Sequence, residues 1–187
     1  MPCIADYKGK YMHFIENINQ DKNLYAINEL SLITIYDDNW FVRNDYDVLS
    51  HGQRKYLINY FGKHGCKLTS GQLLQGEQLS IKLPKPSRQL AISTFDEQYL
   101  QPQENSYWCV TPTTFAEALF KLHRGNEAKQ IEAVKCLIDN CPYNIEWLRD
   151  ISIHSDIENI TVKTYTELMA YQKDVIEKKF KRKRSLK

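Results

Sequence analysis

The segment TPTTFAEALFKLHRGNEAKQIEAVKCLIDN, residues 111–140, determines how the second half of the chain folds. Its apolar residues recur at intervals of three and four, as they do on the buried face of an amphipathic helix. Thr111 or Thr114 can cap a first helix, which Gly125 ends, and Asn126 can cap a second one. The segment therefore predicts two helices joined by a short turn.

Shorter patterns on the N-terminal side of this segment indicate a sheet and one more helix. Residues 30–36, LSLITIY, are rich in Ile and Thr, which is typical of a strand. Residues 10–18 can pair with that strand as a hairpin. Ser50 can cap a helix over residues 51–63, and residues 66–105 have the pattern of strands and loops.

The C-terminal part of the chain mixes helical and strand-like patterns. Asn144 can start a short helix, whereas residues 151–155 and 158–164 alternate well enough to predict strands. Thr164 and Glu167 have the spacing of a capping box, which predicts the start of a long amphipathic helix. The apolar positions expected on the inner face of that helix are Leu168, Met169, Val175, Ile176 and Phe180.

Together these elements predict an α+β protein with a small mixed sheet, a helical C-terminal half and a long amphipathic last helix. We expect one α+β domain over residues 1–177 and a basic tail over residues 178–187. Hydrophobic residues make up 42% of the 187-residue chain, which is enough to form a core.

The composition is typical of a protein that folds in a cytosol. No apolar run approaches the roughly 20 residues that span a bilayer, and the N-terminal residues MPCIADYKGK lack the layout of a signal peptide. The five cysteines are odd in number and spread over the whole length, which favours free thiols. We expect a cytoplasmic protein, with the nucleus as a second compartment if the cell is eukaryotic.

Charge is strongly segregated along the chain, although the net charge is only +2. The last ten residues, KKFKRKRSLK, carry seven cations and no acid, which leaves 18 cations against all 23 acids elsewhere, a net charge of −5. Such a tail favours an anionic partner, either nucleic acid or another polyanion, or an import receptor. The residues expected to bind the anion are Lys178, Lys179, Lys181, Arg182, Lys183 and Arg184.

One short segment, QPQENSYWC at residues 101–109, indicates a specific chemistry. Cys109 lies just before the predicted helix, and the N-terminus of a helix stabilises a thiolate. A thiol nucleophile also needs a histidine to hold its proton and donors that stabilise an oxyanion. Gln103 could supply one such donor. The alternative is that Cys109 is a small apolar residue packed in a core.

The segment PQENSYWC resembles the nucleophile segment of the Ulp/adenain-type cysteine proteases and the related Yop-type acetyltransferases. The similarity covers residues 102–122. In that family the order along the chain is a histidine, an acid, the glutamine and the cysteine. The resemblance implies the catalytic residues His13, Glu29, Gln103 and Cys109, with Asp37 or Asp47 as alternatives to the glutamate.

The segment also departs from that family at three positions. The Asp that precedes the nucleophile is Trp108 here, the Gly that follows it is Val110, and Pro112 delays the helix. These departures leave open an inactive relative that only binds.

Four residues have side chains that could bind zinc. His123, Cys136, Cys141 and His154 are suitable ligand types, but standard sites place their ligand pairs two to four residues apart. Cys136 is also expected on the apolar face of its helix. We therefore predict no metal and no cofactor.

The sequence thus predicts a non-catalytic macromolecule-binding protein that takes a protein partner on its body and an anionic partner on its tail. A small interaction protein of a virus, mobile element or pathogen fits this size and composition. The alternative is a thiol-dependent protease or acyltransferase that acts on proteins through Cys109.

Overall fold

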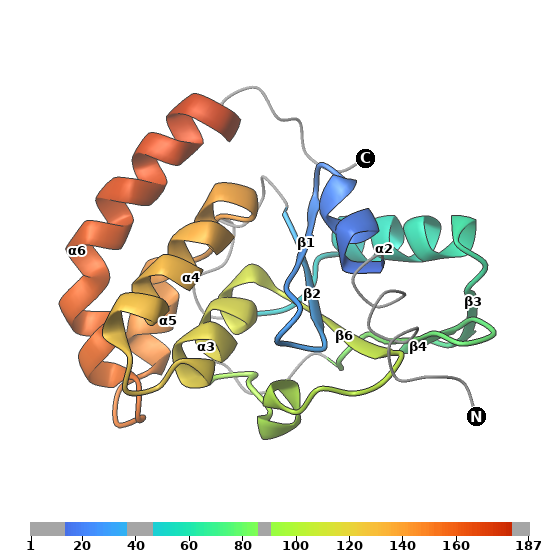
Figure 1. Cartoon of the computed structure of the whole chain (residues 1–187), viewed down its shortest axis with the longest axis horizontal. Helices are drawn as coiled ribbons and strands as arrows, with labels where there is room; N and C mark the ends of the chain where they lie inside the picture. The colour runs from blue at the N-terminus through green and yellow to red at the C-terminus, as the bar shows by residue number, and fades with distance from the viewer. Residues whose placement is uncertain (1–13, 37–46, 86–90, 181–187) are drawn as a thin grey trace, which may run out of the picture.

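The centre of the molecule is a six-stranded mixed sheet (Figure 1). The computed structural model describes residues 14–36, 47–85 and 91–180. The strands lie side by side in the order β1-β2-β6-β5-β4-β3. Along the chain they are β1 (Leu24–Ala26), β2 (Leu32–Ile35), β3 (Lys67–Ser70), β4 (Leu73–Gln75), β5 (Ser80–Lys82) and β6 (Ser106–Val110).

Parallel pairing in the middle of the sheet brings three strand ends together. β6 lies between β2 and β5 and runs parallel to both. β1 pairs antiparallel with β2, and β4 and β3 extend the sheet antiparallel beyond β5. Because parallel strands end on the same side, the carboxyl ends of β2, β5 and β6 meet at one edge of the sheet.

Helices cover both faces of this sheet (Figure 1). One face carries a helix over residues 14–20 and α2 (His51–Lys63), and a short η1 (Glu97–Leu100) precedes β6. The other face of the sheet carries α3 (Pro112–Leu122), α4 (Glu127–Asn140), α5 (Ile145–Ile151), and α6 (Glu158–Val175) with its continuation η2 (Ile176–Phe180). None of the helices in the described part of the chain is both long and apolar enough to cross a membrane.

The strands divide their side chains between two cores. Ile33 and Cys109 belong to the core that contains Leu57 of α2. Leu32 and Val110 belong to the core that contains the buried residues of α3, α4, α5 and α6. The alternation of side chains along a strand thus decides which helices each residue meets.

The predicted α+β class, with its mixed sheet, helical C-terminal half and long last helix, is confirmed. The helix starts predicted at Ser50, Asn126, Asn144 and the Thr111/Thr114 pair are confirmed as well, whereas the start predicted from the Thr164–Glu167 capping box is wrong because α6 begins at Glu158. Ser50 forms a capping box at the start of α2, and Asn126 and Asn144 cap α4 and α5. Of the two candidates for α3, Thr111 is the cap, and its hydroxyl accepts a hydrogen bond from the backbone N–H of Thr114.

The strands predicted near the C-terminus are wrong. Residues 151–155 and 158–164 are not strands, because α5 ends at Ile151 and a turn leads into α6, which begins at Glu158. Thr164 therefore lies inside α6, where its hydroxyl donates to a backbone carbonyl one turn earlier. Packing of α6 against α4 and α5 overrides the strand propensity of its first two turns.

Two further local predictions are wrong. From residue 14 onward the predicted strand 10–18 is a helix that buries Ile15 and Ile18, and β2 pairs with β1 instead. Met169, predicted to face inward, is 39% exposed, because the neighbouring Leu168 takes the buried position.

The last helix extends beyond the predicted boundary between residues 177 and 178. The chain continues as helix through η2, and the ring of Phe180 lies 4.6 Å from the ring of Tyr36, centroid to centroid. Phe180 is only 4% exposed. The first three residues of the segment assigned to the tail therefore belong to a packed helical turn.

Candidate functional site

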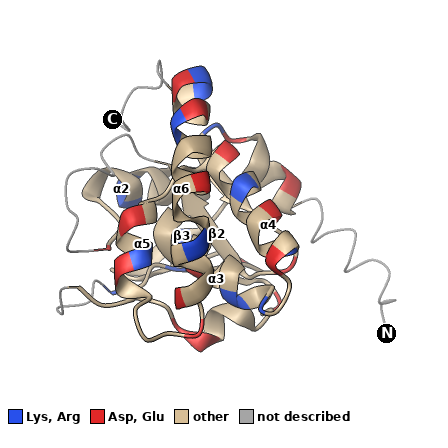
Figure 2. Cartoon of the chain, turned by 90° about the vertical axis from the view of Figure 1, so that its left-hand side faces the viewer, with Lys and Arg blue, Asp and Glu red and all other residues tan. Residues whose placement is uncertain are grey.

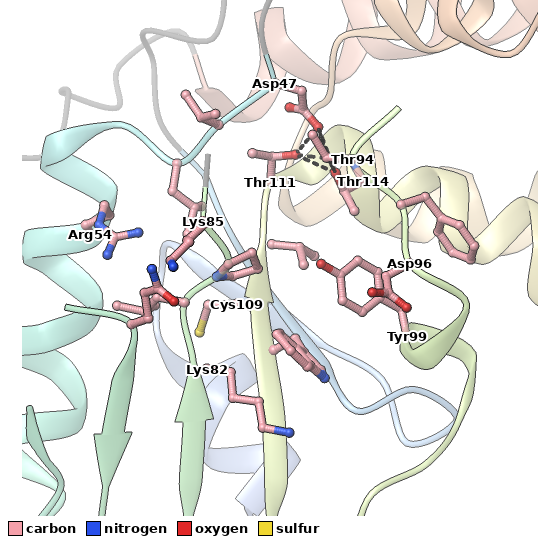
Figure 3. A pocket seen from close by; sticks show the side chains of 18 of the residues that line it. Asp47, Arg54, Lys82, Lys85, Thr94, Asp96, Tyr99, Cys109, Thr111 and Thr114 are labelled. Carbon is pink, nitrogen blue, oxygen red and sulfur yellow. Dashed lines mark hydrogen bonds between the residues drawn. The ribbon is translucent and has the colours of Figure 1, made fainter. Parts of the chain in front are cut away.

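A pocket of about 690 Å³ opens at the edge where the parallel strands β5 and β6 end (Figure 3). Its walls come from residues 47–49, from α2 and the strands beyond β5, from residues 93–99, and from residues 108–114. Ligands of proteins with parallel strands bind outside the carboxyl ends of those strands. Both the size and the position of the pocket are those of a ligand site.

One end of the pocket is a carboxyl group held by threonines. Oδ2 of Asp47 accepts hydrogen bonds from the hydroxyls of Thr111 and Thr114, each at 2.7 Å, and from Thr94 at 3.3 Å. Thr111 caps α3, so the carboxyl group also lies at the positive end of that helix. Within the described residues no hydrogen bond reaches Oδ1 of Asp47.

Two carboxyl groups at this end are held away from water. Burial raises the pKa of Asp47, and the hydrogen bonds from Thr114, Thr111 and Thr94 only partly counteract the rise. Glu117 is 5% exposed and accepts a hydrogen bond of 2.6 Å from the Ser93 hydroxyl. Burial raises the pKa of Glu117 too. Carboxyl groups perturbed in this way are common at functional sites.

Three cations line the pocket away from Asp47. Arg54 of α2 donates to a backbone carbonyl, and the Lys82 ammonium donates to Oε1 of Gln103 at 3.1 Å. Lys85 is exposed and makes no hydrogen bond within the described residues. In Figure 3 the side chains of Arg54 and Lys85 extend toward the same part of the pocket. None of the three forms an ion pair with a described acid.

An aromatic wall connects the two ends. The Lys82 ammonium lies 4.6 Å from the ring centre of Trp108, and the ring of Tyr99 lies 5.6 Å from that of Trp108. Phe95 packs edge-on against Tyr99. Rings in this arrangement give the pocket an apolar surface between its acidic and its basic ends.

Cys109 lies at the wall of this pocket, but its side chain is buried in the core. Its side chain is 0% exposed, and its sulfur has no hydrogen-bond partner within the described residues. Burial raises the pKa of the Cys109 thiol, although the nearby charge of Arg54 acts in the opposite direction. A thiol nucleophile needs a lowered pKa, so this environment favours the neutral thiol.

Of the other residues implied by the protease resemblance, Asp47 lines the same pocket as Cys109, and Gln103 and Glu29 make other contacts. The backbone N–H of Gln103 donates to Oγ of Ser31 at 2.7 Å, and its side-chain oxygen accepts from Lys82. Glu29 is exposed and lines a different cavity, next to α4. His13 and Asp37 lie outside the described residues.

The described cysteines are free thiols in different surroundings. Cys66 and Cys141 are buried, whereas Cys136 is exposed rather than on the inner face of α4 as predicted. In the described ranges no three His, Cys, Asp or Glu side chains gather closely enough to hold a metal ion.

The basic segment 178–187 is described only at its start. Lys178 forms an ion pair with Asp174 at 2.7 Å, and Lys179 forms one with Asp139 at 2.9 Å. Both lysines therefore already have acidic partners on the body of the protein. The other cations expected to bind an anion, Lys181, Arg182, Lys183 and Arg184, lie outside the described residues.

Comparisons with protein-family models, with curated proteins and with solved structures gave no match. The similarity of residues 102–122 to the cysteine proteases therefore rests on the sequence pattern alone.

The sequence did not single out Lys82, Lys85 or Thr94 as site residues, because their positions have no regular spacing relative to Asp47. One signal was present at the start of α3. Thr111 and Thr114 supply two hydroxyls where one cap needs only one, and a surplus of hydroxyls indicates a nearby acceptor.

Proposed function

We propose that the protein is a non-catalytic binding protein, with a body that contacts a protein partner and a basic C-terminal segment that binds a polyanion such as nucleic acid. The observation that carries the non-catalytic part is the fully buried Cys109, whose thiol has a raised pKa. The polyanion part rests on the charge segregation in the sequence.

The charges of the helical face support a separate anion-binding segment. Figure 2 shows acidic and basic residues interleaved over α4, α5 and α6. Many of them neutralise one another, as in the ion pairs Lys121–Asp156, Lys135–Glu167 and Lys163–Glu127. A surface of alternating sign does not attract a polyanion strongly, so the cations beyond Phe180 are the better candidates.

Substitution of the C-terminal cations tests the proposed binding of a polyanion. We expect the fourfold change of Lys181, Arg182, Lys183 and Arg184 to Gln to weaken binding to mixed-sequence duplex DNA. Fluorescence anisotropy between about 50 and 200 mM salt should show a slope of log K against log salt that is shallower by about 0.9 for each lost phosphate contact. The matched control is Lys178→Gln with Lys179→Gln, which removes cations that already form ion pairs. Equal slopes for all three proteins would refute the proposal.

Thiol labelling tests the non-catalytic part. The native protein should react with iodoacetamide at pH 7 at the exposed Cys136 first, and at Cys109 only when the core opens. Peptide mass spectrometry at successive times measures both rates in one sample, and unfolding in urea should make them equal. Labelling of Cys109 ahead of Cys136 in the native protein would instead support the thiol-dependent protease or acyltransferase.

A further inference from the structure

The pocket at the ends of β5 and β6 has two chemically different ends. Arg54 and Lys85 line one side, Lys82 lies beside Trp108, and Asp47 with its three threonines forms the other end. The rings of Trp108 and its neighbours lie between them. A ligand that satisfies both ends must be anionic at one point and must offer a hydrogen-bonding group at another.

Within the described residues no acid forms an ion pair with a cation of the basic side. Arg54 and Lys82 donate hydrogen bonds to neutral oxygens, and Lys85 makes no hydrogen bond within the described residues. Asp96 also lines the pocket, but its carboxylate accepts the backbone N–H of Gln98 as the cap of η1. Three cations beside a partly enclosed cavity create a positive potential that attracts a group of more than one negative charge.

The acidic end of the pocket has an open hydrogen-bonding position that suits a neutral polar group. Its hydroxyl donors all converge on Oδ2 of Asp47, and Oδ1 has no partner within the described residues. The N-terminus of α3, which would otherwise attract an anion, is already occupied by this carboxyl group. A second anion is therefore disfavoured at this end, whereas a ligand hydroxyl can bond to the open oxygen.

We propose that this pocket binds a small phosphate monoester that carries hydroxyl groups, with the phosphate between Arg54 and Lys85 and a hydroxyl on Asp47. A phosphate group carries up to about two negative charges and three acceptor oxygens, which suits several cations better than a carboxylate does. The cavity of about 690 Å³ is large enough for a sugar phosphate or a nucleotide. Sugar phosphates and nucleotides share this chemistry, and the aromatic wall at Trp108 would favour the nucleotide.

Isothermal titration of the full-length protein tests the proposal with inorganic phosphate, ribose 5-phosphate, AMP and adenosine. Ribose 5-phosphate or AMP should bind more tightly than inorganic phosphate and adenosine, and the tighter of the two identifies the class. Arg54→Gln and Lys85→Gln should each weaken every phosphate-containing ligand about tenfold or more, as expected for lost hydrogen bonds to a charged group. Asp47→Asn should weaken the esters and leave inorganic phosphate unchanged.

Two controls keep the result specific to the pocket. Lys55→Gln removes an exposed cation of α2 that does not line the pocket, and it should bind like the wild type. The fourfold tail variant should also bind like the wild type. The proposal fails if no phosphate ester binds at about 10 mM, if Arg54→Gln behaves like Lys55→Gln, or if the tail variant loses binding. Where Arg54→Gln does not fold, Arg54→Lys with its charge retained takes its place, and it should bind with intermediate affinity.

Discussion

Asp47 is a carboxyl group on which burial and hydrogen bonding act in opposite directions. The hydroxyls of Thr111 and Thr114 donate to one of its oxygens at 2.7 Å, and such bonds to a charged group each contribute about 1.5–3 kcal/mol. Burial nevertheless dominates, and the pKa of Asp47 stays above its usual range. Folding therefore makes this carboxyl harder to ionise than it is in the unfolded chain.

A pH dependence of stability follows from this raised pKa. An acid whose pKa is raised by folding contributes stability that is fully present below its unfolded pKa, about 3.9, and is lost as pH rises through the folded pKa. Asp47→Asn cannot ionise and escapes that loss. We expect the free energy of unfolding of Asp47→Asn, relative to wild type, to increase as pH rises above about 4. Urea denaturation at pH values between about 4 and 8 measures it.

Asp96→Asn provides the control for this experiment. It removes one negative charge from the same pocket, at an exposed position, and Asn keeps the cap of η1. Glu117→Gln should behave like Asp47→Asn, because burial raises the pKa of Glu117 as well. Parallel stability curves for wild type and Asp47→Asn over this pH range would show that the Asp47 carboxyl ionises as easily in the folded protein as in the unfolded chain.

The elements that could be predicted from sequence are those that begin with a local signal. Ser50, Asn126 and Asn144 cap helices through bonds to the residue three positions further on, so a short window contains the whole interaction. α6 begins at Glu158 after Ile157, whose side chain makes no capping bond. Its first turns are rich in β-branched residues, and only packing against α4 and α5 makes them helical.

The sheet and the pocket could not be predicted because they depend on long-range pairing. β2 pairs with β6, although the intervening chain forms α2 and three other strands. The pocket draws Asp47, Arg54, Lys82 and Thr94 from separate segments that only this pairing brings together. The role of Cys109 could not be predicted from local sequence either, because the pattern around it fits both a nucleophile and a core residue. Its burial is decided by Ile33 and Leu57, which are distant in sequence.

At the scale of the whole molecule, the last helix contacts both the rest of the helical layer and the residue that follows β2. The side chain of Gln172 accepts from the backbone N–H of Tyr143 at 3.0 Å and donates to its carbonyl at 2.9 Å. One turn beyond α6, Phe180 packs on Tyr36 at the end of β2. The packed part that the structure describes therefore reaches as far as Phe180, and the sequence after it is rich in cations.

Truncation distinguishes these two parts. A chain that ends at residue 180 should keep the melting temperature of the full-length protein, because it retains Phe180. A chain that ends at residue 177 should lose about 3 kcal/mol, the low end for removing a buried phenylalanine, and melt about 6–12 °C lower. Phe180→Ala in the full-length chain should reproduce most of that loss, whereas Lys178→Gln with Lys179→Gln should cost about 1 kcal/mol at most, as exposed ion pairs do. Calorimetry measures all four, and equal melting temperatures for the two truncated chains would show that Phe180 contributes nothing to the core.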